Sequence, residues 1–356
     1  MPESILDAAG TYDRLDPHGL CGRIAALPDQ VTQAWDAARA LALPAGYREA
    51  DRIVVLGMGG SGIGGALLQG LAVDIGANMQ VSVVRGYVLP AYVGPRTLVL
   101  ASSNSGNTEE IVASLGAAAD AGAMCVVLTT GGRLGAMARE RGLPALTFDW
   151  DGEPRSALGW STATLLAICS GLGLLPDLDA DLRAAVAAMR ALAERCGRDV
   201  PEAANAAKQL ARRLAGRLPV IVGAQALAPV AYRWRTQVNE NAKSWAIAEE
   251  LPEMNHNAPL GFGAPPTLLP HLHAVVLRHA SMHPRIRLRV DATMQQLEAV
   301  GVAAEIVDVP GASLLSQVLW AVQLGDFASY YMGLLNGVEP SPVVALDWLK
   351  AYMAAR

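Results

Sequence analysis

Residues 98–111, LVLASSNSGNTEEI, join an apolar run to a loop of small polar residues and then to the start of a helix. This order is typical of a buried strand in a parallel sheet whose loop lies at the carboxyl edge. Glu109 and Glu110 are favoured in the first turn of the following helix. Hydroxyl groups and free N–H groups at a helix start can bind an anion such as phosphate without Lys or Arg. An ordinary helix cap explains the same residue types, so this loop alone leaves the two interpretations equally supported.

Apolar runs and helical patterns alternate along the chain, which predicts an α/β fold with mostly parallel sheets flanked by helices. In the first half, the runs expected to form strands are residues 52–57, 81–85, 97–102 and 125–129. A second strand–Gly–helix pattern begins at Pro219, followed by a helix over 228–241. Further strands are expected near 273–277 and 304–309, with helices over 285–300, 313–335 and 342–355.

The order of these elements predicts two similar α/β halves joined by a helical connector. We expect an N-terminal helical segment over 1–45, a first α/β domain over 46–152, a connector over 153–200 and a second α/β domain over 201–356. Residues 178–215 are rich in Ala, Leu and Arg and predict two helices around Pro201. Residues 255–270 contain several prolines and predict a long loop, a kind of segment that is often functional.

Composition indicates a globular protein with a large core, because 52% of the 356 residues are hydrophobic and 17% are charged. A net charge of −5 without a Lys/Arg run argues against nucleic acid as a partner. The four scattered cysteines and the absence of a signal-peptide pattern predict a cytoplasmic protein with reduced core thiols. Residues 157–175 carry no charge but contain three Gly, so we expect a buried helix there and no membrane partner.

Residues 57–62, GMGGSG, form a G-x-G-x-x-G pattern between a strand and a helix. In a dinucleotide site the next strand should end in Asp or Glu, but here it ends in Arg85 and Gly86. Ser61 would instead face the loop at 102–108 across the carboxyl edge of neighbouring strands. A sugar-phosphate site is therefore favoured over a nucleotide site, and an NADP-dependent oxidoreductase is kept as an alternative.

This pair of loops resembles the sugar-isomerase (SIS) domain family. The segment NENAK at 239–243 and the segment ELPEMNHN at 250–257 resemble the bifunctional phosphoglucose/phosphomannose isomerases, whose NENAK and PE-x-NHN motifs are matched in spacing. The resemblance covers nearly the whole chain. It implies two SIS subdomains, a homodimer, a sugar-phosphate substrate, and neither a metal nor an organic cofactor.

The resemblance also implies a role for individual residues. Glu240 falls on the base that moves a proton between C1 and C2 through a cis-enediol. His256 falls on the group that assists ring opening, usually from the neighbouring subunit. Arg155 falls on the arginine near the enediolate, and Lys350 on a lysine near the ring oxygen. The residues that match the phosphate-binding positions are Gly60, Ser61, Ser103, Ser105 and Thr108.

Two positions depart from the family pattern. Asn104 stands where an aromatic residue commonly precedes the second serine of the phosphate loop, and Ser341 stands where threonine is expected. Both changes leave the hydroxyl donors in place. They bear on the preference between glucose and mannose substrates.

Each site residue has a simpler alternative. Glu240 could be an exposed helix glutamate paired with Lys243 or Arg235. The asparagines beside His256 are expected to fix one ring nitrogen and so to set the tautomer needed for proton transfer, and a structural loop histidine is the alternative. Arg155 could be a surface arginine and Lys350 a solvated tail charge. The remaining histidines that invite a metal interpretation are His271, His273, His279 and His283, of which the first two would share one face of a strand; we expect no metal there. A non-catalytic phosphosugar sensor is the alternative to an enzyme.

Overall fold

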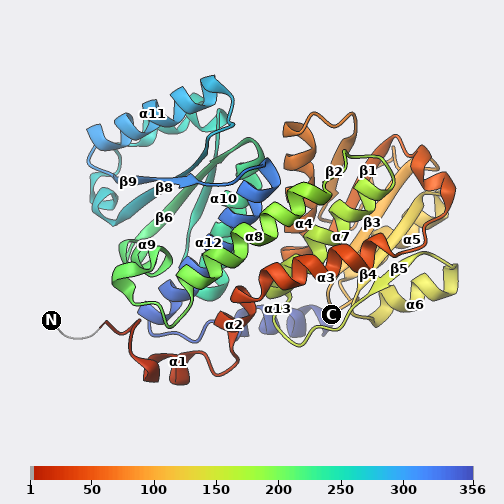
Figure 1. Ribbon diagram of the computed structural model, residues 1–356, viewed down its shortest axis with the longest axis horizontal. Coiled ribbons are helices and arrows are strands. Elements are labelled where there is room, and N and C mark those ends of the chain that lie inside the picture. Colours follow the sequence, from red (N-terminus) through yellow and green to blue (C-terminus); the bar gives the residue numbers. More distant parts are fainter. Residues whose placement is uncertain (1–3, 356) are drawn as a thin grey trace.

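Two parallel sheets, one in each half of the chain, organise the fold (Figure 1). In the computed structural model, which describes residues 4–355, the strand order is β2-β1-β3-β4-β5 in the first sheet and β7-β6-β8-β9 in the second. The first sheet contains β1 (Arg52–Gly57), β2 (Gln80–Val84), β3 (Thr97–Ser103), β4 (Met124–Thr129) and β5 (Ala145–Thr147). The second contains β6 (Leu218–Ala224), β7 (Ile247–Leu251), β8 (Leu272–His279) and β9 (Ala303–Val309). The predicted α/β class with parallel sheets is confirmed.

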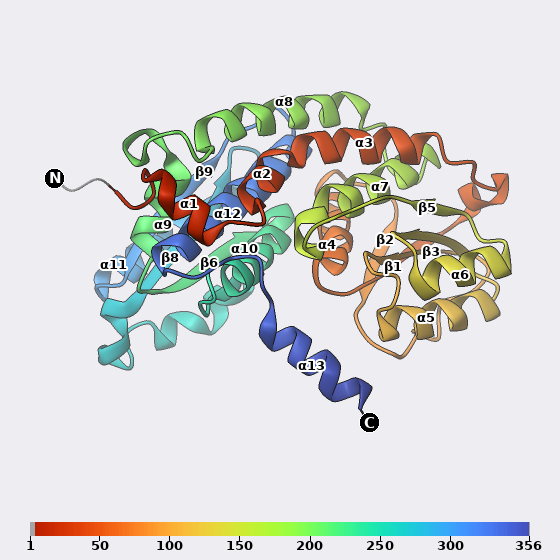
Figure 2. The same cartoon turned by 90° about the horizontal axis from the view of Figure 1, so that it is seen from below.

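Helices cover both sheets and connect the two halves (Figures 1 and 2). Those before the second sheet are α1 (Ala9–Leu15), α2 (Leu20–Ala25), α3 (Leu27–Arg39), α4 (Gly59–Asp74), α5 (Glu109–Asp120), α6 (Gly132–Arg141), α7 (Leu158–Gly171), α8 (Asp179–Cys196) and α9 (Ala206–Leu214). Those that come after the first strand of the second sheet are α10 (Ala228–Asn241), α11 (Pro284–Ala299), α12 (Leu314–Leu335) and α13 (Val344–Ala354).

The expected elements agree closely with the observed ones, with two omissions. The strands β5 and β7 lie at the edges of their sheets and were not expected from the sequence. β5 has only three residues, and β7 reads IAEEL with most of its side chains partly or fully exposed. Neither therefore shows the apolar run of a central strand. The predicted loop over 255–270 is largely folded into the short 3₁₀ helices η5 (Glu253–His256), η6 (Ala258–Gly261) and η7 (Pro266–His271).

Helix α4 joins the two halves, because it packs against β1 and β2 of the first sheet and also against α10. A Cβ atom at Gly70 would lie 3.1 Å from Pro229 Cγ, so this glycine permits a close approach of α4 to the start of α10. Helix α7 is buried along nearly its whole length and packs against α3 and α4, as expected for the uncharged segment. Among residues 4–355, no helix is both long and apolar enough to cross a membrane.

The cysteines Cys21, Cys125, Cys169 and Cys196 are free and buried, as the sequence predicts for core thiols. Helix α13, by contrast, projects from the body of the molecule (Figure 2). Its apolar side chains remain exposed, with exposed fractions of 75% for Val344 and 65% for Trp348. The C-terminal helix is therefore the one α-helix of the described chain that buries no apolar face.

Candidate active site

The two loops singled out in the sequence lie side by side at the carboxyl edge of the first sheet. Strands β1 and β3 are paired with Gly57 opposite Ser102, so the loop into α4 and the loop into α5 leave the sheet at the same level. The hydroxyl groups of Ser103 and Thr108 lie 2.8 Å apart across the second loop. Thr108 occupies the N-cap position of α5, but its side chain does not cap the helix. The first N–H groups of α5 therefore keep their capacity to bind an anion.

Gly106 gives the second loop its shape. Its φ of +66° lies in the left-handed region, and a Cβ atom there would lie 1.9 Å from Gly131 O. The neighbouring carbonyl of Asn104 accepts hydrogen bonds from the N–H of Thr130 at 3.0 Å and from its hydroxyl at 2.7 Å. The loop after β4 thus fixes the backbone of the predicted phosphate loop through hydrogen bonds, while Ser105 stays exposed.

The first turn of α4 connects these loops with the segment that carries Arg155. A Cβ atom at Gly60 would lie 3.2 Å from Pro154 O and 3.3 Å from Arg155 Cα. Ser61, the next residue, is half-buried, and within the described chain its hydroxyl has no hydrogen-bond partner. Gly60 therefore permits a close approach that brings the first of the predicted phosphate-binding loops next to η2 (Pro154–Ala157).

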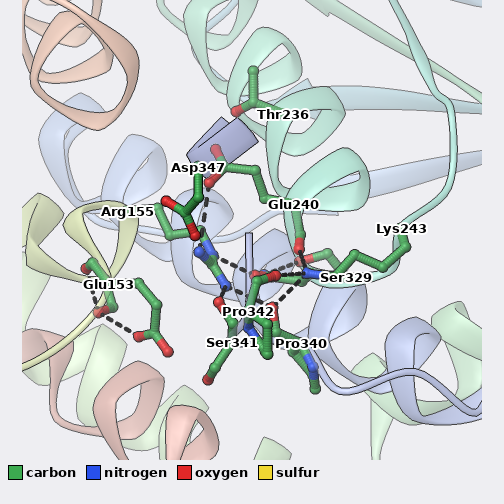
Figure 3. Close-up of polar contacts among 12 residues, drawn as sticks. Glu153, Arg155, Thr236, Glu240, Lys243, Ser329, Pro340, Ser341, Pro342 and Asp347 are labelled. Carbon is green, nitrogen blue, oxygen red and sulfur yellow. Dashed lines mark hydrogen bonds and ion pairs between the residues drawn. The ribbon is translucent and has the colours of Figure 1, made fainter. Parts of the chain in front are cut away.

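Arg155 on η2 and Glu240 near the end of α10 point toward each other (Figure 3). Arg155 Nη1 lies 3.5 Å from Glu240 Oε2, and the exposed fraction is 3% for the arginine side chain and 30% for the glutamate. Burial lowers the pKa of Arg155, and the Glu240 carboxylate is the largest influence that opposes this shift. The alternative that Arg155 is a surface arginine is therefore wrong. The alternative that Glu240 is an exposed helix glutamate paired with Lys243 or Arg235 is wrong as well, because its carboxylate pairs with Arg155.

Three further donors of Arg155 are held by groups away from Glu240. Nε donates to Asn241 Oδ1 at 2.7 Å, and Nη2 donates to the carbonyls of Pro340 at 2.7 Å and Ser341 at 3.3 Å. Only Nη1, whose contact with Glu240 is long, retains capacity to bind another group. In such a pair the carboxylate is suited to move a proton, and the guanidinium is suited to stabilise the negative charge that develops on a bound substrate.

Lys243 stabilises the same corner from the end of α10. Its Nζ donates to the carbonyls of Glu240, Pro340 at 2.8 Å and Pro342 at 2.6 Å (Figure 3). Burial, followed by the nearby Arg155, lowers the pKa of Lys243. Both cations thus fix the segment that leads into α13.

His256 and Lys350 are not brought to this site within the described chain. His256 is exposed on η5 and has no hydrogen-bond partner among residues 4–355. The expectation that its neighbouring amides fix the ring is wrong, because Asn255 donates to Thr293 at 2.9 Å and Asn257 donates to Glu253 at 3.3 Å. Lys350 lies on α13 with 75% of its side chain exposed and pairs with Asp347 at 3.4 Å.

The remaining histidines are separated by the fold. His271 ends η7, whereas His273 lies in β8, so the two do not share one strand face. His273 is buried and contacts Glu305 at 2.9 Å and Arg217 at 3.0 Å. His279 is buried in the same strand, and His283 caps α11. In the part of the chain that the structure describes, no group of three or more His, Cys, Asp or Glu could hold a metal ion.

Arg85, at the position where a dinucleotide site would carry an acidic residue, turns back onto the first loop. Its Nη2 donates to the carbonyl of Gly62 at 3.2 Å, and its guanidinium lies over the ring of Tyr232. The side chain is therefore engaged within the protein. No carboxylate stands at this position to bind a ribose, which agrees with the choice of a sugar-phosphate site over a nucleotide site.

The chain is similar to known proteins in sequence and in fold. Residues 203–353 match the model of the bacterial phospho-glucose isomerase C-terminal SIS domain. A bifunctional phosphoglucose/phosphomannose isomerase of Caldicellulosiruptor bescii is 36% identical over 92% of this chain and 97% of its own length. Another protein of that name from Aquifex aeolicus is 32% identical over 84% of this chain and 89% of its own length. A hypothetical protein from Thermus thermophilus shares the fold, with a TM-score of 0.77 and 18% identity over 98% of this chain and 92% of that one.

Proposed function

The chain belongs to the family of bifunctional phosphoglucose/phosphomannose isomerases, and from that premise we propose that it interconverts glucose 6-phosphate with fructose 6-phosphate and mannose 6-phosphate with fructose 6-phosphate. It is a sugar-phosphate isomerase with two SIS-type parts. The observation that carries the choice of site is the contact of the Arg155 guanidinium with the Glu240 carboxylate, next to the first of two adjacent hydroxyl-bearing loops. We assign the regions 46–152 and 201–356 to the two SIS domains, because each range contains one complete sheet.

The phosphate of the substrate binds to the paired loops at the edge of the first sheet. Gly60 lets the backbone approach, and the hydroxyl donors are Ser61, Ser103, Ser105 and Thr108. The first N–H groups of α5 add donors whose partial positive charge favours a dianion. This arrangement needs no lysine or arginine at the phosphate.

The reaction moves one proton between neighbouring carbons of the open-chain sugar. Glu240 removes the proton from C2 of the aldose, and the electron pair of that C–H bond forms the C1–C2 double bond while the C1 carbonyl oxygen takes up the negative charge of a cis-enediolate. The proton of the C2 hydroxyl then passes to the C1 oxygen, and the C2 carbonyl forms as Glu240 returns its proton to C1, which gives the ketose. Arg155 Nη1 stabilises the negative charge on the enediolate oxygen.

We propose that a homodimer completes the site, with His256 donated by the neighbouring subunit for ring opening and Lys350 directed at the ring oxygen. The exposure of His256 and the uncovered apolar side chains Val344, Leu346 and Trp348 of α13 support an assembly that buries them. Mixing Glu240→Gln with His256→Ala protein tests this. If His256 comes from the partner, random exchange of subunits leaves both residues intact in about one quarter of the sites, so activity should return on mixing. No recovery after verified subunit exchange would refute donation across the interface.

A coupled assay of the pure protein with glucose 6-phosphate and mannose 6-phosphate in parallel tests the proposed activity. We expect turnover of both substrates. Binding of fructose 6-phosphate without any turnover would instead establish a non-catalytic phosphosugar sensor.

A further inference from the structure

We propose that Asn241, the residue after the proposed base, positions Arg155 for the reaction and that Ser329 fixes the orientation of the Asn241 amide. The inference rests on the proposed function, because it assigns Arg155 to the enediolate. Asn241 does not contact Glu240 through its side chain and is therefore a positioning residue.

The Asn241 side chain is fully buried and has a partner on each side. Its Oδ1 accepts the Nε–H of Arg155 at 2.7 Å, and its Nδ2 donates to Ser329 Oγ at 3.0 Å. Ser329 Oγ donates its proton to the carbonyl of Asp326 at 3.0 Å. Because that proton is committed, Ser329 accepts from Asn241, and a flipped amide would direct N–H groups at the guanidinium.

The backbone of Arg155 is held by the same region. Arg233 Nη2 donates to the carbonyl of Arg155 at 3.1 Å, and the guanidinium of Arg233 forms two hydrogen bonds with Asp326 at 2.9 and 2.7 Å. Arg233 and Asp326 are both buried, with exposed fractions of 1% and 4% for the side chains. Helix α12 thus supports both ends of Arg155, through Asp326 and through Ser329.

The orientation of the guanidinium follows from these contacts. Nε is held by Asn241 and Nη2 by two backbone carbonyls, so the planar group has one defined rotation with Nη1 on the side of Glu240. Without the Asn241 acceptor, Nε–H loses its partner in a buried site and the guanidinium can rotate about the carbonyl contacts. A shift of about 1 Å at a catalytic group can lower the rate about 100-fold.

The test compares Asn241→Ala with Asn336→Ala. Asn336 donates to the carbonyl of Ala242 and the hydroxyl of Ser244, both at 2.9 Å, so it also holds the end of α10 but touches neither Arg155 nor Glu240. We expect Asn241→Ala to lower kcat about 100-fold with less than about a threefold change of KM. Asn336→Ala should keep kcat within about twofold. Asn241→Asp retains an acceptor for Nε, so its kcat should be at least about tenfold higher than that of Asn241→Ala.

A double-mutant cycle with Arg155→Lys separates positioning from a structural role. If Asn241 acts through the guanidinium, Asn241→Ala should lower kcat less than about threefold in the Arg155→Lys background. Ser329→Ala is a smaller change, which keeps the cycle available if Asn241→Ala does not fold. It should lower kcat about three- to tenfold in the parent protein and leave kcat unchanged in the Arg155→Lys background.

Equal losses of kcat in Asn241→Ala and Asn336→Ala, or losses that multiply fully with Arg155→Lys, would overturn the inference while leaving the isomerase activity established. Wild-type protein that turns over neither phosphosugar would overturn the proposed function instead, before any variant is measured.

Discussion

Replacing Gly106 by Ala perturbs the proposed phosphate loop at one atom, and the structure allows the cost to be divided into two parts. The residue has a φ of +66°, a conformation that costs an alanine about 1–2 kcal/mol. The new Cβ would also lie 1.9 Å from Gly131 O and 2.7 Å from Thr129 Oγ1, so the loop must move, at a further cost of about 1–3 kcal/mol. We therefore expect Gly106→Ala to lower the free energy of unfolding by about 2–5 kcal/mol.

Gly76→Ala is the matched control, because Gly76 has a φ of +68° and a Cβ atom added there would have no neighbouring atom within 4 Å. It should lose only about 1–2 kcal/mol. Urea unfolding measures both stabilities, and the coupled assay measures KM for glucose 6-phosphate. Displacement of the loop should raise KM in Gly106→Ala and leave it unchanged in Gly76→Ala. Equal stabilities of the two variants, or an unchanged KM in Gly106→Ala, would refute this account of the loop.

Arg155, Glu305 and the four cysteines each have surroundings whose effect a single experiment can measure. Arg155→Lys keeps the charge but loses the fork that contacts Asn241 and two carbonyls, so kcat should fall about 100-fold or more in the coupled assay; a fall below threefold contradicts the role. Burial alone would raise the pKa of Glu305, but hydrogen bonds from His273 and Arg213 outweigh it and lower this pKa to about 2, so the stabilisation is present above the ordinary value of 4.5 and is lost as the pH falls toward 2. Glu305→Gln should thus cost about 1–3 kcal/mol at pH 7 and clearly less at pH 2.5 in urea unfolding, and an equal cost at both pH values would contradict this. Burial raises the pKa of the core thiols, to about 12 for Cys169, so native protein should not react with a thiol reagent while unfolded protein shows four thiols; rapid labelling of the native protein would contradict the burial.

Most of the fold was predictable because its central strands are continuous apolar runs and most of its helices carry apolar residues at helical spacing. The helix at Ala228–Asn241 and the strand at Arg52–Gly57 have the predicted limits. The edge strands Ala145–Thr147 and Ile247–Leu251 were missed because pairing on one side and partial exposure leave no apolar run. Their position depends on the neighbouring strand and not on their own residues.

The candidate site shows the same division between local pattern and tertiary contact. Glu240 was singled out by a motif, but its partner Arg155 lies 85 positions away in a polar segment that resembles a surface loop, and its burial depends on the packing of distant parts of the chain. The support from Ser329 on α12 left no sequence signal, although Asn241 stands within the motif itself. The amides beside His256 donate to Thr293 and Glu253, contacts that depend on the local backbone fold and leave no signal in the sequence.

Exchange of hydrogen with the solvent tests directly whether Glu240 moves the proton between C1 and C2. Wild-type protein that converts glucose 6-phosphate in deuterated water should introduce deuterium at the carbon that receives the proton, as NMR of the fructose 6-phosphate shows. Glu240→Gln, which keeps the size of the side chain, should bind the sugar phosphate but lose deuterium incorporation about 100-fold or more. Glu298→Gln, at an exposed position on α11, serves as the control and should incorporate deuterium as the wild type does. Incorporation at the parent rate by a folded, substrate-binding Glu240→Gln variant would contradict the account.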